Sequence, residues 1–260
     1  MKFHFFKYQA TGNDFILIDN RSGKLSFTKE QIEQVCHRKF GVGADGLILI
    51  EKDPKADFNV NYFNSDGSQS LCGNGSRAAV HFASGLGIVN GKALFSAYDG
   101  LHDAELLKSG IIRLKMNDVS AIKRLGDDFL INTGSPHYIR FVSNLKDFPV
   151  FDEGRAIRYS DTYKEKGVNV NFVELLPGNV IFVRTYERGV ENETLSCGTG
   201  VTAAALAAYF NGYSSPVIVK APGGELSVEF TPEEAGQTDT FTDIFLIGPA
   251  KMVFEGDLEL

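Results

Sequence analysis

Several features that would assign the protein to a common class are scarce or absent from its 260 residues. Three cysteines are too few for a disulfide scaffold, and an odd number does not suggest secretion. No apolar run approaches the roughly 18–20 residues of a membrane span, and the first residues lack the apolar core of a signal peptide. Lys and Arg total 26 against 33 Asp and Glu, with no basic stripe, which disfavours nucleic-acid binding. We therefore expect a cytoplasmic globular protein that binds neither nucleic acid nor membrane.

The signatures of common metal and nucleotide sites are also absent. No Cys-x-x-Cys pair occurs and the five histidines are scattered, so the sequence predicts no metal site. Neither a P-loop nor a Gly-x-Gly-x-x-Gly motif between a strand and a helix is found. The glycine-rich stretch 41–46 is instead followed by an apolar run, 47–51, that is typical of a strand.

The apolar residues form short runs separated by Gly, Asn and Asp, a pattern typical of a strand-rich protein. Helices are expected after a capping box at Thr28, over about residues 74–86, and over about residues 198–210. The last of these contains no charged residue, so strands are expected to wrap around it. We predict an α+β fold with mixed sheets, including strands at 58–63, 111–114, 168–173, 180–186 and 217–219.

Three short motifs occur twice, in the same order and 122 to 126 positions apart. Self-similarity at one long offset indicates duplicated structural units, and two copies favour two similar domains over a solenoid. The predicted domains are residues 1–117, completed by a C-terminal strand at 249–260, and residues 118–248. The paired motifs are Thr11-Gly12-Asn13-Asp14-Phe15 with Thr133-Gly134-Ser135-Pro136-His137, Gly41-Val42-Gly43 with Gly167-Val168-Asn169, and Cys72-Gly73-Asn74-Gly75 with Cys197-Gly198-Thr199-Gly200.

Each predicted domain has a Cys-Gly-x-Gly motif, beginning at Cys72 or Cys197, between a polar loop and a predicted helix. A cysteine there lies at the positive end of the helix dipole, beside unpaired N–H groups that favour the thiolate. The same N–H groups can hold a carboxylate, and the glycines let a ligand approach the backbone. Two such thiols on opposite sides of one carbon suit inversion of an amino-acid α-centre: one thiolate removes the proton and the other thiol returns one.

Simpler interpretations compete for individual residues. One cysteine before a helix is often a small buried apolar side chain, although two in matched motifs favour chemistry. Cys36 shares the apolar face of Ile32 and Val35 and is expected in the core. His137 is as readily explained as a core histidine, whereas a solvated surface charge is the less favoured interpretation of Arg188. Asparagines in turns are common for backbone reasons alone.

At these motifs the sequence resembles the diaminopimelate epimerase family. The similar segments follow the family's order and cover nearly the whole chain. They are Ala10-Thr11-Gly12-Asn13-Asp14-Phe15, residues 41–46, Asn64-Ser65-Asp66-Gly67, Cys72-Gly73-Asn74-Gly75-Ser76-Arg77, Gly167-Val168-Asn169-Val170-Asn171-Phe172, Glu187-Arg188-Gly189, Cys197-Gly198-Thr199-Gly200 and Gly248-Pro249-Ala250.

The resemblance implies a reaction, a fold and a set of site residues. Family members interconvert LL- and meso-2,6-diaminopimelate, on the route to lysine and peptidoglycan, without a cofactor. Their fold pairs two mixed β-barrels, each around a central helix, with the active site in the cleft between the domains. The implied acid/base pair is Cys72 and Cys197, assisted by His137 and Glu187. The implied substrate contacts are Gly73, Asn74, Gly198 and Thr199 at the inverted centre, and Asn13, Asn64, Asn169, Glu187 and Arg188 around the rest of the molecule.

Two positions depart from the family pattern. Ser135 stands where many members have Asn before Pro-His, and Gly46 stands where some have Gln, so neither side-chain contact is carried over. The expected partner is the small-molecule substrate. A homodimer is one assembly that the resemblance allows, and the sequence leaves the oligomeric state open.

Other classes of protein share parts of this pattern. Proline racemases and hydroxyproline epimerases resemble the family in fold and paired thiols, but usually have Cys-Gly-His at the first motif and Asp-Arg-Ser before the second. Here Asn74 and Glu187-Arg188-Gly189 occupy those places, and a cyclic imino acid would leave Arg188 without a distal carboxylate. A dithiol redox protein needs no Asn and Arg array for a small zwitterion. A non-catalytic amino-acid binder needs the helix N-termini but neither thiol.

Overall fold

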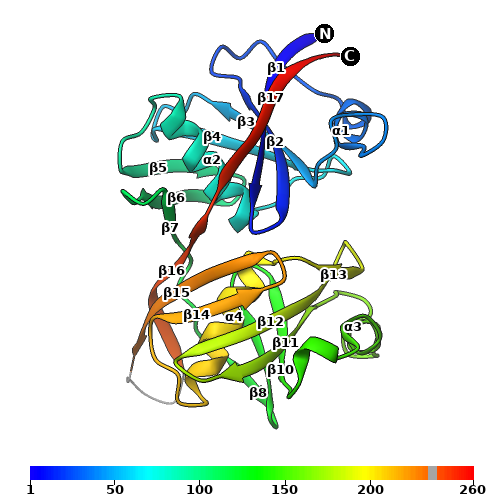
Figure 1. Ribbon diagram of the computed structural model, residues 1–260, viewed down its shortest axis with the longest axis vertical. Helices are drawn as coiled ribbons and strands as arrows, with labels where there is room; N and C mark the ends of the chain where they lie inside the picture. Colours follow the sequence, from blue (N-terminus) through cyan, green and yellow to red (C-terminus); the bar gives the residue numbers. More distant parts are fainter. Residues whose placement is uncertain (234–238) are drawn as a thin grey trace. The chain divides into compact units, whose positions relative to one another are not determined.

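The computed structural model describes residues 1–233 and 239–260. The chain divides into two compact units, one formed by residues 1–114 and 248–260 and the other by residues 115–247 (Figure 1). The first unit contains β1 (Lys2–Ala10), β2 (Asn13–Asp19), α1 (Lys29–Cys36), β3 (Gly46–Glu51), β4 (Phe58–Asn64), α2 (Gly73–Gly85), β5 (Lys92–Ala97), β6 (Gly100–Leu106), β7 (Ile111–Lys115) and β17 (Lys251–Glu259). The second contains β8 (Lys123–Leu125), β9 (Asp128–Asn132), β10 (Pro136–Phe141), η1 (Leu145–Asp147), α3 (Val150–Arg158), β11 (Asn169–Leu176), β12 (Val180–Glu187), β13 (Asn192–Thr194), α4 (Gly198–Tyr209), β14 (Val217–Ala221), β15 (Gly224–Glu233) and β16 (Thr240–Pro249).

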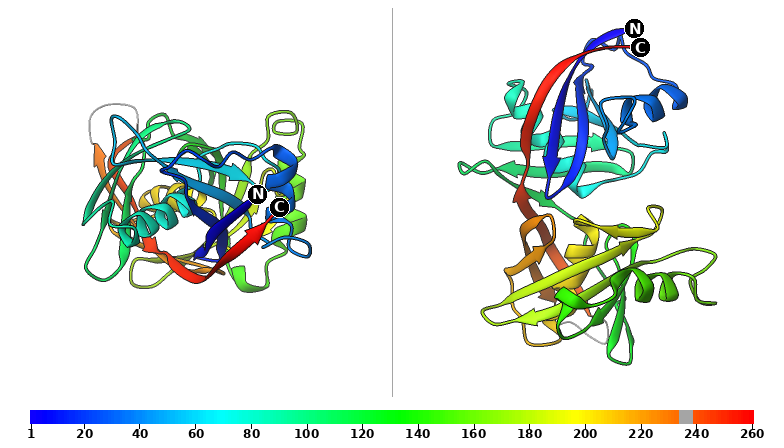
Figure 2. Two further views of the ribbon diagram at one scale, coloured as in Figure 1. Left: turned by 90° about the horizontal axis from the view of Figure 1, so that it is seen from above. Right: turned by 45° about the vertical axis from the view of Figure 1, so that its right-hand side comes forward.

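The strands of the first unit form a mixed sheet in the order β17-β1-β2-β3-β4-β5-β6-β7. The β2–β3 and β4–β5 pairs are parallel, and the remaining pairs are antiparallel. β17, red in Figure 1 and in the right-hand view of Figure 2, runs antiparallel along blue β1, so the two chain ends lie side by side.

The second unit repeats this pairing scheme in the order β8-β9-β10-β11-β12-β14-β15-β16. Its parallel pairs, β10–β11 and β12–β14, correspond in chain order to β2–β3 and β4–β5 of the first unit. Along the chain, a short helix lies between the third and fourth strands of each order, and a longer helix lies between the fifth and sixth. The predicted α+β fold of two similar mixed-sheet units is therefore confirmed.

A long helix lies against the strands in each unit. α2 contacts β1, β2, β3, β4, β6 and β17, and α4 contacts β9, β10, β11, β12, β14 and β15. Every residue of α4 is buried except Thr199 and Tyr209, which are half-buried, as its lack of charge requires. The prediction that strands wrap around this uncharged helix is confirmed. Among the described residues, no helix is long and apolar enough to span a bilayer.

The sequence predicts only one of the two short helices, α1 and α3. α1 begins at the predicted capping box: Thr28 Oγ1 accepts from the Gln31 N–H, and Gln31 Oε1 accepts from the Thr28 N–H. α3 is a helix that the sequence patterns above do not predict. Its N-terminus has no side-chain cap, and only Val150 and Gly154 of its nine residues are buried.

Candidate active site

Both Cys-Gly-x-Gly motifs place their cysteine at the N-cap of a long helix. Cys72 caps α2 with extended backbone angles (φ −128°, ψ 111°), and Cys197 caps α4 in nearly the same conformation (φ −111°, ψ 111°). The Gly75 N–H donates to Cys72 Sγ at 3.4 Å. Neither helix has an acidic residue in its first turn. Each sulfur thus lies where the helix dipole and free N–H groups favour a negative charge.

Two carboxamides lie beside Cys72. Asn13, at the start of β2, places its Oδ1 3.5 Å from Cys72 Sγ, within hydrogen-bonding reach of the thiol. The Asn74 amide Nδ2 donates to the same Asn13 oxygen at 3.4 Å. Asn13 is therefore brought into contact with Cys72 and Asn74, two predicted site residues that lie 59 and 61 positions later in the chain.

Arg77 lies behind Asn74 and is fully buried in α2. Its Nη2 donates to Asn74 Oδ1 at 2.9 Å and to Thr11 Oγ1 at 3.1 Å, and its Nη1 donates to the Gly73 carbonyl at 3.4 Å. Burial lowers the pKa of Arg77 to about 10, and the nearby Cys72 opposes this shift. The guanidinium is thus protonated at neutral pH. Among the described residues no carboxylate pairs with it, and its Nε has no hydrogen-bond partner.

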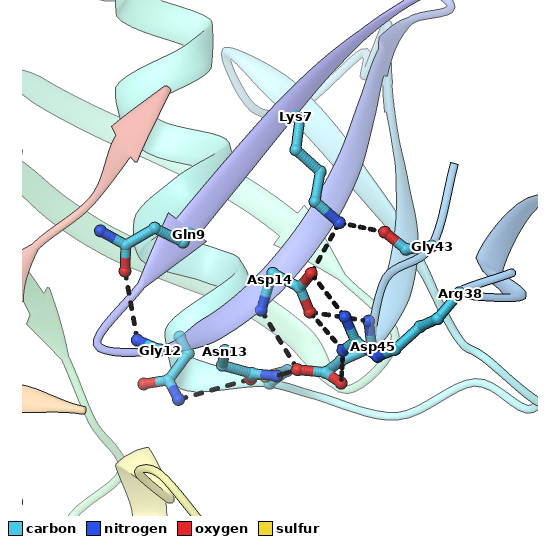
Figure 3. Close-up of polar contacts among 10 residues, drawn as sticks. Lys7, Gln9, Gly12, Asn13, Asp14, Arg38, Gly43 and Asp45 are labelled. Carbon is cyan, nitrogen blue, oxygen red and sulfur yellow. Dashed lines mark hydrogen bonds and ion pairs between the residues drawn. The ribbon is translucent and has the colours of Figure 1, made fainter. Parts of the chain in front are cut away.

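A charged cluster lies on the other side of Asn13 (Figure 3). Asp14 pairs with Lys7 at 2.7 Å and with Arg38 at 2.7 Å, and Arg38 also reaches Asp45 at 2.7 Å. Burial raises the pKa of Asp14, but the hydrogen bonds and charges of Arg38 and Lys7 outweigh it and lower that pKa to about 2. Asn13 Nδ2 donates to Asp45 Oδ2.

Asn64 braces the loop that leads to Cys72. Its Nδ2 donates to Ser68 Oγ at 3.0 Å and to Ser70 Oγ at 3.1 Å, and its Oδ1 accepts from Tyr62 at 2.9 Å. Gly46, the position where some relatives carry Gln, is enclosed by neighbours: a Cβ there would lie 2.4 Å from the Tyr62 ring. A side chain at this position therefore requires Tyr62 to move.

In the second unit a hydrogen-bonded chain ends at Cys197. Thr199 Oγ1 lies 3.5 Å from Cys197 Sγ and 2.9 Å from His137 Nε2. On the opposite side of the imidazole, Asn171 Nδ2 lies 3.1 Å from His137 Nδ1. Asn171 Nδ2 also donates to the Tyr138 carbonyl at 3.2 Å, and because a carbonyl can only accept, the Asn171 amide nitrogen must face the histidine. Nδ1 of His137 is therefore the acceptor, and its Nε2–H donates to Thr199.

His137 is fully buried and neutral. Burial and the charge of Arg188 lower its pKa to about 3. Because Thr199 Oγ1 accepts from His137, its own hydroxyl hydrogen is available to the Cys197 sulfur. Gly200 permits this packing, since a Cβ there would lie 2.3 Å from Asn171 Oδ1 and 3.3 Å from the His137 ring.

Arg188 and Asn169 form a second cluster of predicted site residues. Asn169 Oδ1 accepts from the Arg188 backbone N–H at 2.9 Å, and Asn169 Nδ2 donates to Ser135 Oγ at 2.9 Å. The Arg188 guanidinium donates to the Lys166 carbonyl at 3.0 Å and lies 3.5 Å from Ser135 Oγ. The Ser135 hydroxyl thus lies between Asn169 and Arg188.

The remaining predicted residues take clear positions. Glu187 ends β12, and its Oε2 accepts from Thr194 Oγ1 at 2.9 Å, three residues before Cys197. Cys36 is buried in the core beside Ile32 and Val35, and burial raises its pKa to about 12.

Four residues near the cysteines received no role from the sequence: Asp45, Arg77, Asn171 and Thr185. Two of them carry a usable signal. Arg77 is the only formally charged residue in α2, and Asn171 follows Asn169 at the two-residue period of one strand face, in the first half of a strand that is otherwise apolar up to Val173. The positions of Asp45 and Thr185 depend on strand pairing and have no comparable signal.

Comparisons with known proteins match nearly the whole chain to one family. The family model described as diaminopimelate epimerase matches residues 5–121 and 129–253. A diaminopimelate epimerase from Flavobacterium psychrophilum is 48% identical over 256 residues, covering 96% of this chain and 98% of the relative. Another from Aquifex aeolicus is 42% identical over 277 residues, covering 98% of this chain and 97% of the relative.

Solved structures show a similar fold at low identity. A phenazine biosynthesis protein of the PhzF family from Bacillus anthracis has a TM-score of 0.76 at 15% identity, with full coverage of both chains. A hydroxyproline epimerase from Agrobacterium vitis has a TM-score of 0.69 at 15% identity, covering all of this chain and 93% of that one. These likenesses establish the fold, whereas the sequence matches over nearly the whole length establish the family. The chain belongs to the diaminopimelate epimerase family.

Proposed function

We propose that the protein interconverts LL- and meso-2,6-diaminopimelate without a cofactor, in the formation of lysine and peptidoglycan precursors. Cys72 and Cys197 are the two acid/base groups. The observation that carries this assignment is the matched placement of both cysteines at the N-caps of long helices that begin with Gly-x-Gly. Each of the two units contributes one thiol.

The reaction needs one thiolate and one thiol at the same carbon. The thiolate accepts the α-proton, and the thiol on the opposite face donates a proton to the resulting carbanion, so that the configuration inverts. In the reverse direction the two roles exchange. The negative charge that develops on the substrate carboxylate is stabilised by backbone N–H groups of the helix starts. We assign Gly73 and Asn74 of α2 and Gly198 and Thr199 of α4 to this contact.

The neighbours of Cys197 support its role. A neutral His137 donates its Nε2–H to Thr199, and the Thr199 hydroxyl is in turn oriented toward Cys197 Sγ. His137 therefore acts by fixing the donor beside the sulfur, because a group with a pKa of about 3 does not carry a proton at neutral pH. Glu187 is assigned to the same region as a polar group that assists the thiols and the substrate.

The distal amino-acid end of the substrate is assigned to Asn13, Asn64, Asn169, Glu187 and Arg188. Arg188 supplies the positive charge that a second carboxylate needs, in a cluster with Asn169 and Ser135. A proline-type substrate has no such carboxylate, and this disfavours the racemase alternative. The protein is further proposed to work in the cytoplasm, and a homodimer is proposed as its assembly.

Incorporation of solvent deuterium tests this proposal directly. Pure protein incubated with LL-diaminopimelate in deuterium oxide is expected to release meso product labelled at the inverted α-carbon. If the protein labels proline in a parallel incubation but leaves diaminopimelate unlabelled, the racemase alternative replaces the proposal. Binding of diaminopimelate without any label would indicate a non-catalytic binder.

A further inference from the structure

The two carboxamides beside Cys72 raise a question of orientation. An Asn side chain presents an acceptor oxygen and a donor nitrogen of nearly equal size, which exchange places when the amide rotates by half a turn. For Asn13 the choice decides whether the Cys72 sulfur meets an acceptor or a donor. For Asn74 it decides what the Asn13 oxygen meets.

The residues at the two ends of this pair allow only one answer. Asp45, an ionised carboxylate, can only accept, so the Asn13 nitrogen must face it (Figure 3). Arg77, a protonated guanidinium, can only donate, so the Asn74 oxygen must face it, 2.9 Å from Nη2. The remaining atoms then meet in the middle, where Asn74 Nδ2 donates to Asn13 Oδ1 at 3.4 Å.

We propose that Asp45 and Arg77 are positioning residues that fix the polarity of the Asn74–Asn13 amide pair and thereby make Asn13 Oδ1 the acceptor for the Cys72 thiol. The inference rests on the proposed acid/base role of Cys72. It assigns functions to two residues that contact the two amides of this pair.

Both end residues are themselves held in place. Asp45 Oδ1 accepts from Arg38 at 2.7 Å, and Asp45 Oδ2 accepts from the Asp14 backbone N–H at 3.1 Å. Arg77 is fully buried and pairs with no carboxylate among the described residues. A guanidinium buried without a counter-ion is unfavourable for stability alone, so a role beside the cysteine explains its presence.

The fixed polarity matters because Cys72 must work in two protonation states. The Gly75 N–H and the helix start favour the thiolate, whereas an acceptor oxygen at 3.5 Å favours the thiol. These opposing contacts keep both forms accessible, which a group that is the base in one direction and the acid in the other requires. A reversed Asn13 would place a second donor at the sulfur and favour the thiolate only.

The test is a double-mutant cycle on the reactivity of Cys72 without substrate. The rate of iodoacetamide alkylation at pH 7, resolved by peptide mass spectrometry, is compared in wild type, Asp45→Ala, Asn13→Ala and the double variant. Asp45→Ala is expected to raise the rate about tenfold, because Asn13 can then turn its N–H toward the thiolate. In the Asn13→Ala background the same change is expected to have less than about a twofold effect.

The cycle separates positioning from simple charge removal. An Asp45→Ala effect of equal size in both backgrounds would show that only the lost negative charge acts, and no effect in the wild-type background would overturn the proposal equally. If Asp45→Ala does not fold, Asp45→Asn replaces it: Arg38 retains the oxygen of the new amide, so that its nitrogen faces Asn13.

The Arg77 end is tested by rescue. Arg77→Lys keeps a donor-only group and is expected to retain kcat within about threefold, whereas Arg77→Met is expected to lower it at least tenfold. In an Asn74→Ala background, Arg77→Met should cause no further loss of kcat. Equal losses in the Lys and Met variants would contradict the polarity argument. Because the alkylation cycle uses no substrate, its failure is distinguishable from absence of epimerisation in the deuterium experiment.

Discussion

His137 Nε2 lies 2.9 Å from Thr199 Oγ1, and this bond joins β10 to the first turn of α4 beside Cys197. Since Asn171 occupies the other ring nitrogen as a donor, the tautomer of His137 is determined by its surroundings. The histidine therefore acts as a fixed neutral donor, and the hydroxyl of Thr199 connects it to the sulfur.

Thr199→Val tests this connection, because it keeps the shape and removes the hydroxyl. We expect kcat to fall about ten- to hundredfold, because the Cys197 sulfur loses its oriented donor and the buried His137 N–H is left unsatisfied. Steady-state conversion of LL to meso isomer measures the loss. Thr202→Val is the matched control: Thr202 donates to the Gly198 carbonyl within the same helix, and its replacement should change kcat far less. Equal effects of the two variants would contradict the assignment.

Replacement of either proposed acid/base residue should abolish most turnover. Cys72→Ser and Cys197→Ser are each expected to lower the rate of epimerisation at least ~10²-fold, the lower range for a positioned acid/base group. Cys36→Ser is the control, because that thiol is buried in the core and its pKa of about 12 keeps it protonated. It should leave turnover nearly unchanged. Full activity in either Cys72→Ser or Cys197→Ser would end the two-thiol proposal.

The lowered pKa of His137 predicts that the stability of the folded protein depends on pH. Its pKa is about 3 in the folded protein against 6.5 ordinarily, so between these values the unfolded chain binds a proton that the native state excludes. The free energy of unfolding should thus be fully retained above about pH 6.5 and fall as the pH decreases toward 3. At pH 5 the loss amounts to about 2 kcal/mol. Denaturant unfolding at pH 5 and 7.5 measures it, and His137→Gln should flatten the difference. If the free energy of unfolding of His137→Gln depends on pH as strongly as that of the wild type, the pH dependence arises from other groups.

Arg188→Ala should weaken substrate binding more than it slows chemistry. Loss of a charge-assisted hydrogen bond to a carboxylate, ~1.5–3 kcal/mol, corresponds to a KM increase of about ten- to hundredfold. Arg155→Ala removes an exposed arginine of α3 and is the control for net charge. If both variants have the same KM, Arg188 does not hold the distal carboxylate.

Gly46→Ala should destabilise the first unit, because its Cβ would lie 2.4 Å from the Tyr62 ring and 2.6 Å from the Phe63 carbonyl oxygen. We expect a decrease of about 1–3 kcal/mol in the free energy of unfolding, the usual range for overpacking. Gly85→Ala, at the end of α2 with nothing within 4 Å of its Cβ, should be neutral or slightly stabilising. Comparable stability of both variants would show that Tyr62 moves aside freely.

The internal repeat shows which parts of the fold can be predicted from the sequence. Motif pairs at one offset predict two similar units, and strand pairing follows the same scheme in both. The same repeat would place a helix between β10 and β11 as the counterpart of α1. α3 nevertheless has no side-chain cap and buries only two residues, so neither of the two signals that mark α1 marks it clearly. A local sequence pattern predicts a helix only where the residues supply a clear apolar face or a cap.

The sequence alone determined the family, the α+β fold and the placement of Cys72 and Cys197 at helix starts, because these depend on residues adjacent in the chain. Tertiary structure alone decided which groups face the two sulfurs. Asp45 reaches Asn13 through the pairing of β2 with β3, and Asn171 reaches His137 through the pairing of β10 with β11. The direction of an amide and the tautomer of an imidazole depend on such distant partners, since each is set by which neighbour can only donate and which can only accept.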